Sequence, residues 1–285
     1  DGRGQIVSNS FDLVGNRTGL KYHGSLQLSY AFDSANRLTN LTDWASHSTR
    51  FTHDNANRLT EIAFPNNVAA SFTLDGNDRI TGYSYGGTSN FIERAITRNS
   101  LGFKTIENIT AGLEPTPLSG KQFRNHNAAD QLVHNSANDY NPDLYEDHNP
   151  FYDANGNMTS LVVTATGSVV SIAYYSYDAE NRLTNLESGT WNLELLYDGS
   201  GNLISKTENG TTTYFVIDYA DPLARPLMET TTNGTPTRYY VWSGQQLISI
   251  VETNGNVYFT HFDELGNLLA LSDSNGSVVA QFAYT

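Results

Sequence analysis

A seven-residue pattern recurs along this 285-residue chain and limits what the chain can fold into. Its form is aromatic-Asp-x-x-Gly/Asn-Asn/Arg-aliphatic, and the first four copies are spaced strictly 21 residues apart. The aspartates of the eight good copies are Asp12, Asp33, Asp54, Asp75, Asp153, Asp178, Asp198 and Asp263. Self-similarity at a fixed period indicates a repeat architecture, in which each unit packs mainly on its neighbours.

Each copy predicts a strand, a tight turn and a return strand. The aromatic residue ends the first strand, and the aspartate opens the turn, where its carboxylate can accept a backbone N–H two residues on. Three residues after the aspartate, Gly or Asn can adopt the positive φ that a tight hairpin requires. The repeat aromatics are Phe11, Phe32, Tyr152, Tyr177, Tyr197 and Phe262, and the turn glycines are Gly15, Gly156, Gly201 and Gly266.

The segments between copies alternate as strands do, for example at 214–217 and 257–260. No segment shows a sustained helical stripe with a cap at each end. The sequence therefore predicts an all-β fold made of an array of hairpins.

The pattern resembles the YD repeat of the Rhs (rearrangement hotspot) family. This family includes bacterial polymorphic toxins, insecticidal toxin-complex subunits, wall-associated Rhs proteins and teneurins. The copies at 152–161, 177–186 and 197–206 match closely. The segments 261–266 and 273–276 resemble the start of the Rhs-associated core. The resemblance implies a spiralling β-ribbon that curls into a hollow shell.

We expect one YD-repeat shell segment over residues 1–285. Its expected parts are regular repeats of 21 residues at 1–100, an irregular turn-rich stretch at 101–150, further repeats at 151–257, and the start of the core at 258–285. Asp1–Ile6 reads as a repeat without its aromatic, so the chain is expected to be a fragment.

The composition fits a wall and excludes several classes of function. With tyrosine left out and glycine included, apolar residues make up about 40% of the chain, against roughly 45–50% in ordinary domains. We interpret this low apolar fraction as the sign of a wall one sheet thick whose two faces are both exposed to water. A net charge of −14 argues against nucleic-acid binding, and the absence of long apolar runs argues against membrane insertion. The chain has no cysteine and therefore no disulfide.

We predict no catalytic residue, no metal site and no cofactor. The repeat aspartates could serve as general acids or calcium ligands, but turn capping explains why they recur with the turn. The acidic group Asp139, Asp143, Glu146 and Asp147 with His148 could bind a cation, but we interpret it as a solvated loop.

Two further motifs were weighed as functional sites. Asp221-Pro222 resembles the autoprotease motif of Rhs toxins, but it lacks the following glycine and precedes the core, so no autoproteolysis is expected. The aromatic group at 174–177, 239–240 and Trp242 is either a sugar-stacking platform or, as we favour, part of a half-wet wall.

The leading hypothesis is a non-catalytic structural shell of a large secreted or surface protein, bacterial in origin. It would enclose or scaffold a C-terminal effector, a toxin or a partner's domain. The alternative is an extracellular adhesion or envelope-scaffold module that binds glycans or proteins through its outer loops. A polysaccharide-acting enzyme ranks last, because it rests on carboxylates that the turns explain.

Overall fold

The computed structural model describes residues 4–112, 121–138, 146–165, 168–244 and 246–284, with the backbone alone at 121–124, 134–138 and 146–147. These residues form 25 strands in two sheets. The first sheet contains β1 (Ser8–Phe11), β2 (Arg17–Lys21), β3 (Gln27–Phe32), β4 (Leu38–Thr42), β5 (Ser48–His53), β6 (Leu59–Ala63), β7 (Ala69–Leu74), β8 (Ile80–Gly86), β9 (Asn90–Arg98) and β10 (Lys104–Ala111). The second contains β11 (Lys121–His126), β12 (Leu132–Asn138), β13 (Glu146–Tyr152), β14 (Met158–Ala165), β15 (Ser168–Tyr177), β16 (Leu183–Ser188), β17 (Trp191–Tyr197), β18 (Leu203–Glu208), β19 (Thr211–Asp218), β20 (Arg225–Thr230), β21 (Pro236–Ser243), β22 (Gln246–Glu252), β23 (Val257–Phe262), β24 (Leu268–Ser272) and β25 (Val278–Gln281).

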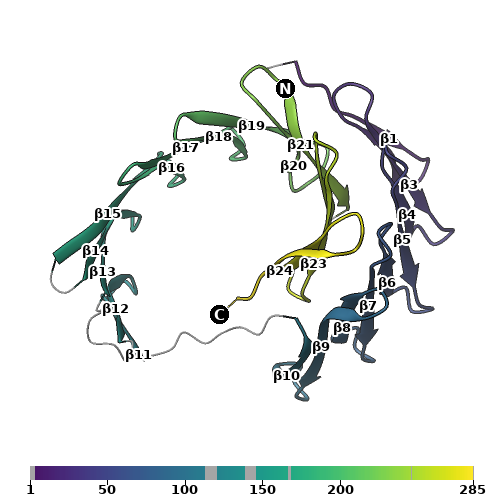
Figure 1. Cartoon of the computed structure of the whole chain (residues 1–285), viewed down its shortest axis with the longest axis horizontal. Coiled ribbons are helices and arrows are strands. Elements are labelled where there is room, and N and C mark those ends of the chain that lie inside the picture. The colour runs from purple at the N-terminus through teal and green to yellow at the C-terminus, as the bar shows by residue number, and fades with distance from the viewer. Residues whose placement is uncertain (1–3, 113–120, 139–145, 166–167, 245, 285) are drawn as a thin grey trace. The chain divides into compact units, whose positions relative to one another are not determined.

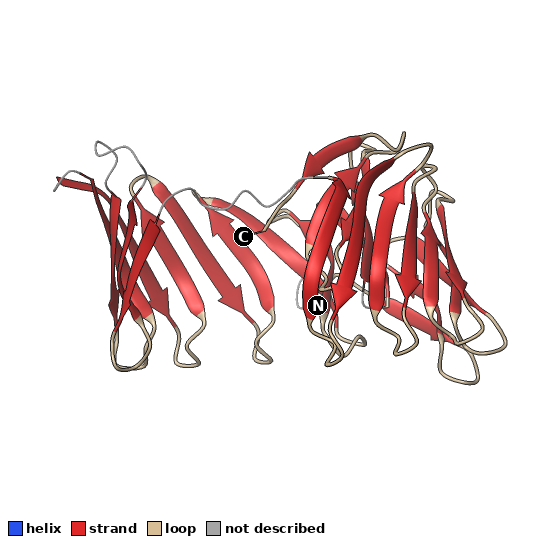
Figure 2. Ribbon diagram, turned by 90° about the horizontal axis from the view of Figure 1, so that it is seen from below, coloured by secondary structure: helices blue, strands red, loops and turns tan. Residues whose placement is uncertain are grey.

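Both sheets are ribbons in which each strand bonds to the strands that precede and follow it in the chain. The pairing is antiparallel, as in β3 with β4 and β15 with β16, so tight turns make the connections (Figure 2). This confirms the predicted all-β array of hairpins. No described residue belongs to a helix, so within that part of the chain no helix could span a bilayer.

A bulge follows the repeat turn and sets the register of the return strand. In the β3–β4 hairpin Phe32 pairs with Leu38 and Ala31 with Asn40, so Thr39 is an extra residue on the return strand. The same skip occurs at Thr60 in β5–β6 and at Thr184 in β15–β16. The extra residue lies three positions beyond the left-handed residue of the turn, so this bulge belongs to the return strand and not to the loop.

The chain separates into two compact units, which are described separately. Unit 1 comprises 1–115, 216–229 and 236–285, and unit 2 comprises 116–215 and 230–235. Unit 1 thus holds β1–β10 together with the C-terminal strands β21–β25 and most of β20. The expectation of one shell segment with four parts remains a prediction.

Unit 1 has two layers, because its C-terminal strands pack on one face of the β1–β10 sheet (Figure 1). The core between them joins Leu20, Leu28 and Ile62 from the first sheet to Leu227 and Phe259 from the second. Tyrosine hydroxyls at the same interface donate to backbone carbonyls of the opposite layer: Tyr22 to Tyr240 (2.6 Å), Tyr30 to Trp242 (3.1 Å) and Tyr85 to Phe262 (2.9 Å). The expectation of a one-sheet wall without a core is therefore wrong for unit 1.

One repeat position shows how differently the two units bury the same residue type. The residue eight positions after the repeat aspartate is apolar in most copies. In the β1–β10 sheet of unit 1 these residues are at most 4% exposed: Leu20, Leu41, Ile62 and Tyr83. Leu271, the equivalent residue of the copy at Asp263, is partly buried. In unit 2 the equivalent Leu161 and Leu186 are only partly buried. The difference arises because a second layer covers this face of the sheet in unit 1, whereas the described part of 116–215 buries no large hydrophobic side chain fully.

Candidate functional site: a ladder of aspartate turns

The repeat turn is a three-residue hairpin loop closed by two backbone hydrogen bonds. In the second copy Asp33 N–H donates to the carbonyl of Arg37, and Asn36 N–H donates to the carbonyl of Asp33, both at 3.0 Å. Asn36, three residues after the aspartate, has a φ of 60°. This combination is a type I turn followed by a left-handed residue, which matches the twist of the flanking strands.

The aspartate carboxylate holds the loop from inside. In all eight copies Oδ1 accepts the backbone N–H groups two and four residues later, at 2.8–3.1 Å. Both donors favour the ionised carboxylate. At Asp75 the side chain and backbone of Arg79 lower the pKa to about 2, and Arg58 lowers the pKa of Asp54 in the same way.

The second carboxylate oxygen binds the side chain of the residue four positions later. Where that residue is arginine, its Nε lies 2.7–2.8 Å from Oδ2, as in Arg37, Arg58, Arg79 and Arg182. Where it is asparagine, Nδ2 takes the same place at 2.7–3.0 Å, as in Asn16, Asn157, Asn202 and Asn267. The Asn/Arg choice in the pattern is therefore a choice between two donors to one acceptor.

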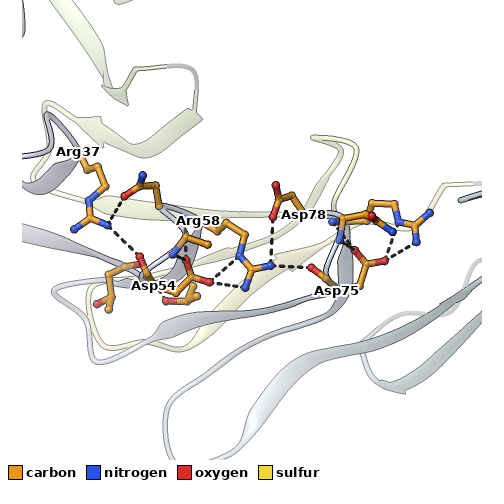
Figure 3. Close-up of polar contacts among 11 residues, drawn as sticks. Arg37, Asp54, Arg58, Asp75 and Asp78 are labelled. Atoms are coloured by element: carbon orange, nitrogen blue, oxygen red, sulfur yellow. Dashed lines mark hydrogen bonds and ion pairs between the residues drawn. The ribbon is translucent and has the colours of Figure 1, made fainter.

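The same side chains reach the next turn and join successive repeats into a ladder. Figure 3 shows Arg58 donating from Nη1 to the carbonyl of Asp75 at 2.7 Å, with Asp78 Oδ1 at 3.3 Å. Arg37 makes the equivalent bonds to Asp54 O and Asn57 Oδ1, each at 3.1 Å. In unit 2 Asn157 Nδ2 donates to Asn181 Oδ1 at 2.7 Å, and Arg182 Nη1 donates to Asp198 O at 3.4 Å. Each of these hydrogen bonds between turns, which we call a rung of the ladder, therefore holds one repeat turn beside the next.

The repeat aromatics and glycines lie where the pattern places them, beside the turn. The four turn glycines have φ between 85° and 92°. Tyr177 donates from its hydroxyl to Met158 O at 3.0 Å, and the guanidinium carbon of Arg182 lies 4.9 Å from the centre of the Tyr197 ring. Phe11 is 55% exposed. That these residues serve the array and not a ligand remains a proposal.

A threonine six residues after the residue that opens the turn completes the motif, and sequence reasoning missed it; the opening residue is Asn99 in one case and aspartate in the other four. It is the bulged residue, and its hydroxyl donates at 3.1–3.3 Å to the carbonyl of the residue eight positions earlier, on the strand before the turn. The threonines are Thr39, Thr60, Thr105, Thr159 and Thr184. Their regular position after the residue that opens the turn was the signal that identifies them.

Two turns of the same kind also escaped the pattern. Asp43 Oδ1 accepts N–H groups from Ala45 and His47, although its left-handed residue is Ser46. In Asp221–Arg225 the carboxylate accepts Leu223 N–H, and Ala224 has a φ of 46°. The Asp221-Pro222 sequence, which resembles a protease motif, thus forms a turn in the connection between β19 and β20, where Asp221 N–H donates to Asp218 O and Ala224 N–H to Asp221 O.

The weighed cation site lies mostly outside the described residues. Asp139 and Asp143 are not described, and of Glu146 and Asp147 only the backbone is. Among the residues that the structure describes, no three His, Asp or Glu side chains gather closely enough to hold a metal ion.

The left-handed position predicts opposite effects for two glycines of one turn. Gly201 has a φ of 88°, where an L side chain costs about 1–2 kcal/mol, so Gly201→Ala is expected to destabilise unit 2 by that amount. Gly199 opens the same loop without a positive φ, and a Cβ there meets open space. Gly199→Ala should be neutral or stabilise by up to about 1 kcal/mol. Urea unfolding of both variants measures the difference, and equal effects would contradict the assigned turn geometry.

The ladder predicts a salt-sensitive contribution from Arg58. Arg58→Gln is expected to lower the melting temperature more than Arg50→Gln, a change on strand β5 of the same hairpin, because of these two arginines it is Arg58 that links two turns. In about 1 M NaCl, where the Debye length is ~3 Å, the difference in melting temperature between the two variants should become smaller. Calorimetric melting at two salt concentrations tests this, and a gap that does not respond to salt would argue against the ionic rungs.

Part of the chain is similar in sequence to known proteins. Residues 152–189 match the family model described as RHS Repeat. A tRNA3(Ser)-specific nuclease WapA of Bacillus spizizenii is 36% identical over 137 residues, and a tRNA nuclease WapA of Bacillus subtilis is 32% identical over 136. Each match covers 47% of this chain and 5% of the relative, so the chain spans a small part of those proteins.

Solved structures extend the likeness to almost the whole chain. The Photorhabdus luminescens Tc holotoxin pore has a TM-score of 0.62 at 11% identity, covering 98% of this chain and 17% of that one. The TcdB2–TccC3 crystal structure has a TM-score of 0.62 at 10% identity, covering 99% and 18%. At such low identity the likeness shows that the fold is shared.

Proposed function

Because this chain is a member of the Rhs/YD-repeat family, we propose that it is a non-catalytic wall segment of a larger secreted or surface-exposed protein. The wall would enclose or scaffold an effector or partner domain. The observation that carries the proposal is the ladder of turns, which joins consecutive hairpins into continuous ribbons of 10 and 15 strands. Such a ribbon grows by repetition and suits a container.

The relatives support the view that the repeats and the catalytic activity belong to different parts of one long chain. The WapA proteins are nucleases by name, and the matched stretch is 5% of their length. The carboxylates of the repeat are engaged by backbone N–H groups, which suits structure and leaves them poor general acids. We therefore propose that any catalytic activity of the parent protein resides outside these repeats.

Limited proteolysis of the full-length parent protein tests the enclosure. The polypeptide that follows the repeats should resist a protease until the repeats themselves are cut, and should be digested at once when it is expressed alone. Digestion at equal rates with and without the wall would contradict enclosure. A parent gene that encodes no further polypeptide after Thr285 would contradict a C-terminal cargo.

A further inference from the structure

One face of the unit 2 ribbon carries large apolar side chains that are exposed to solvent. Phe151, Tyr174 and Leu196, on strands β13, β15 and β17, are each 55–56% exposed. Phe151 pairs with Ser160 on β14, and Ser160 pairs with Tyr174, so these three side chains form a row on one face. A single exposed apolar side chain is ordinary, whereas several on one face indicate an interaction surface.

The equivalent positions of unit 1 hold small or polar side chains. In the β1–β10 sheet the residues two and four positions before the aspartate face away from the core, because the residue between them, such as Tyr30 or Phe51, packs in it. Those positions hold Ala31, Thr52 and Thr73, and Ser29, Arg50 and Ser71. In unit 2 the same positions hold Phe151, Ser176 and Leu196, and Asn149, Tyr174 and Glu194. The apolar side chains of this face are therefore specific to unit 2 and are not required by the repeat turn.

Exposed carboxylates lie beside these apolar side chains. Glu187 on β16 is opposite Tyr174, and Glu194 on β17 is opposite Asn185, which lies on β16 two residues before Glu187. Residues two apart on a strand share a face, so Glu194 and Leu196 belong to this face as well. Glu187 Oε1 accepts a hydrogen bond from Asn185 Nδ2 at 2.9 Å, and within the described residues neither glutamate forms an ion pair. Unit 2 as a whole has 12 acidic and 4 basic side chains, a net charge of −8, so the face is both apolar and negative.

We propose that this surface, the aromatic face of unit 2 (Phe151, Tyr174, Glu187, Glu194 and Leu196), binds a cationic protein segment in which aliphatic or aromatic side chains alternate with lysine or arginine. The apolar side chains of the segment would cover Phe151 and Leu196, and its cations would pair with the carboxylates or lie over the Tyr174 ring. Like charge disfavours other occupants, because a second copy of this chain brings a net charge of −14, and nucleic acids and anionic membranes are also negative. The proposal goes beyond enclosure, since it gives the wall itself a partner.

Binding of three octapeptides to the whole chain tests this surface. The probes alternate lysine with leucine, glutamate with leucine, and lysine with serine, and each carries a fluorophore for anisotropy titration in about 0.15 M NaCl. We expect the lysine–leucine peptide to bind saturably, and at least about tenfold more tightly than either of the others. The reason is that it alone matches both the apolar side chains and the negative charge of the aromatic face.

Paired substitutions in unit 2 locate the binding. Phe151→Ser with Tyr174→Ser should weaken the binding of the lysine–leucine peptide about tenfold. Both side chains are more than half exposed, so this pair should keep the fold. Glu187→Gln with Glu194→Gln should weaken the same binding severalfold and reduce its dependence on salt, because it removes the two carboxylates and leaves the apolar side chains in place.

A matched control makes the same charge change in unit 1. Glu61→Gln with Glu93→Gln removes two carboxylates from the uncovered face of the β1–β10 sheet and should leave the peptide binding unchanged. Equal binding of the three peptides, binding that neither unit 2 pair alters, or an equal loss in the unit 1 control would overturn the proposal. A dimer of the chain alone, seen by sedimentation and dispersed by the two serine substitutions, would also overturn it, because a second copy would then be the occupant.

Discussion

Acidification from pH 7 to pH 4 is expected to weaken unit 1 by about 3 kcal/mol, because His261 is buried in neutral form. His261 is 0% exposed and packs against the rings of Phe64, Tyr85 and Phe91. Its Nε2 is hydrogen-bonded to Ser272 Oγ at 2.8 Å, and its Nδ1 has no hydrogen-bond partner among the described residues. Burial lowers the pKa of His261 from 6.5 to about 3.

The sign and the pH window follow from this shift. Between pH 6.5 and about 3 the unfolded chain binds a proton at this histidine that the folded chain does not, so stability falls as pH falls through the window. The turn aspartates titrate in more acidic solution, because their pKa values are lowered from 3.8, and they lose their contribution progressively below about pH 5. The range from pH 6.5 to about 5 therefore isolates the histidine.

Urea unfolding across pH 4–7 measures this effect. His261→Gln, which cannot titrate, should flatten the pH dependence, although its stability at pH 7 is lower. His53→Gln, at a repeat turn in strand β5, should keep the parent's pH dependence. A parent profile that is flat above pH 4, or one that His261→Gln leaves unaltered, would contradict the neutral buried histidine.

Truncating Ile62 is expected to destabilise unit 1 by about 2–5 kcal/mol, the usual cost of removing a large aliphatic side chain from a core. Ile62 is 0% exposed and belongs to the core between the two layers. Leu186 holds the same repeat position in unit 2 but is only partly buried there. Leu186→Ala should cost less, about 1 kcal/mol, because the missing atoms are partly replaced by water.

These two variants distinguish the stability that comes from the second layer from the stability that comes from the repeat position alone. Denaturant unfolding of Ile62→Ala and Leu186→Ala, each against the parent chain, gives the two free-energy changes. If the repeat alone set the burial, the two variants would lose equal stability, and the assignment of a two-layer core to unit 1 would be refuted.

The turns were predictable because everything they need is local. An aspartate, a residue that tolerates positive φ three positions on, and a donor at the fourth position lie within five residues, so the pattern Asp33–Arg37 specifies its own loop. The turns at Asp43 and Asp221 were missed because Ser46 and Ala224 occupy the left-handed position, where their residue types are uncommon. There the flanking strands impose a conformation that the loop residues do not favour by themselves.

By itself, the sequence determined the array of hairpins and its turns, since the hydrogen bonds that form a turn join residues that are close in the chain. Tertiary structure alone decided which face of the ribbon is dry. The contacts that close the core join residues about 200 positions apart, such as Tyr22 with Tyr240 and Asn66 with Ser272. A repeat places the same residue type at the equivalent position of every copy, so Leu41 and Leu186 look alike in sequence. Leu41 is buried because the C-terminal strands of unit 1 pack on it, whereas in the described part of the chain no second layer covers Leu186. The same C-terminal strands contribute His261 to the core and pack Trp242 against it.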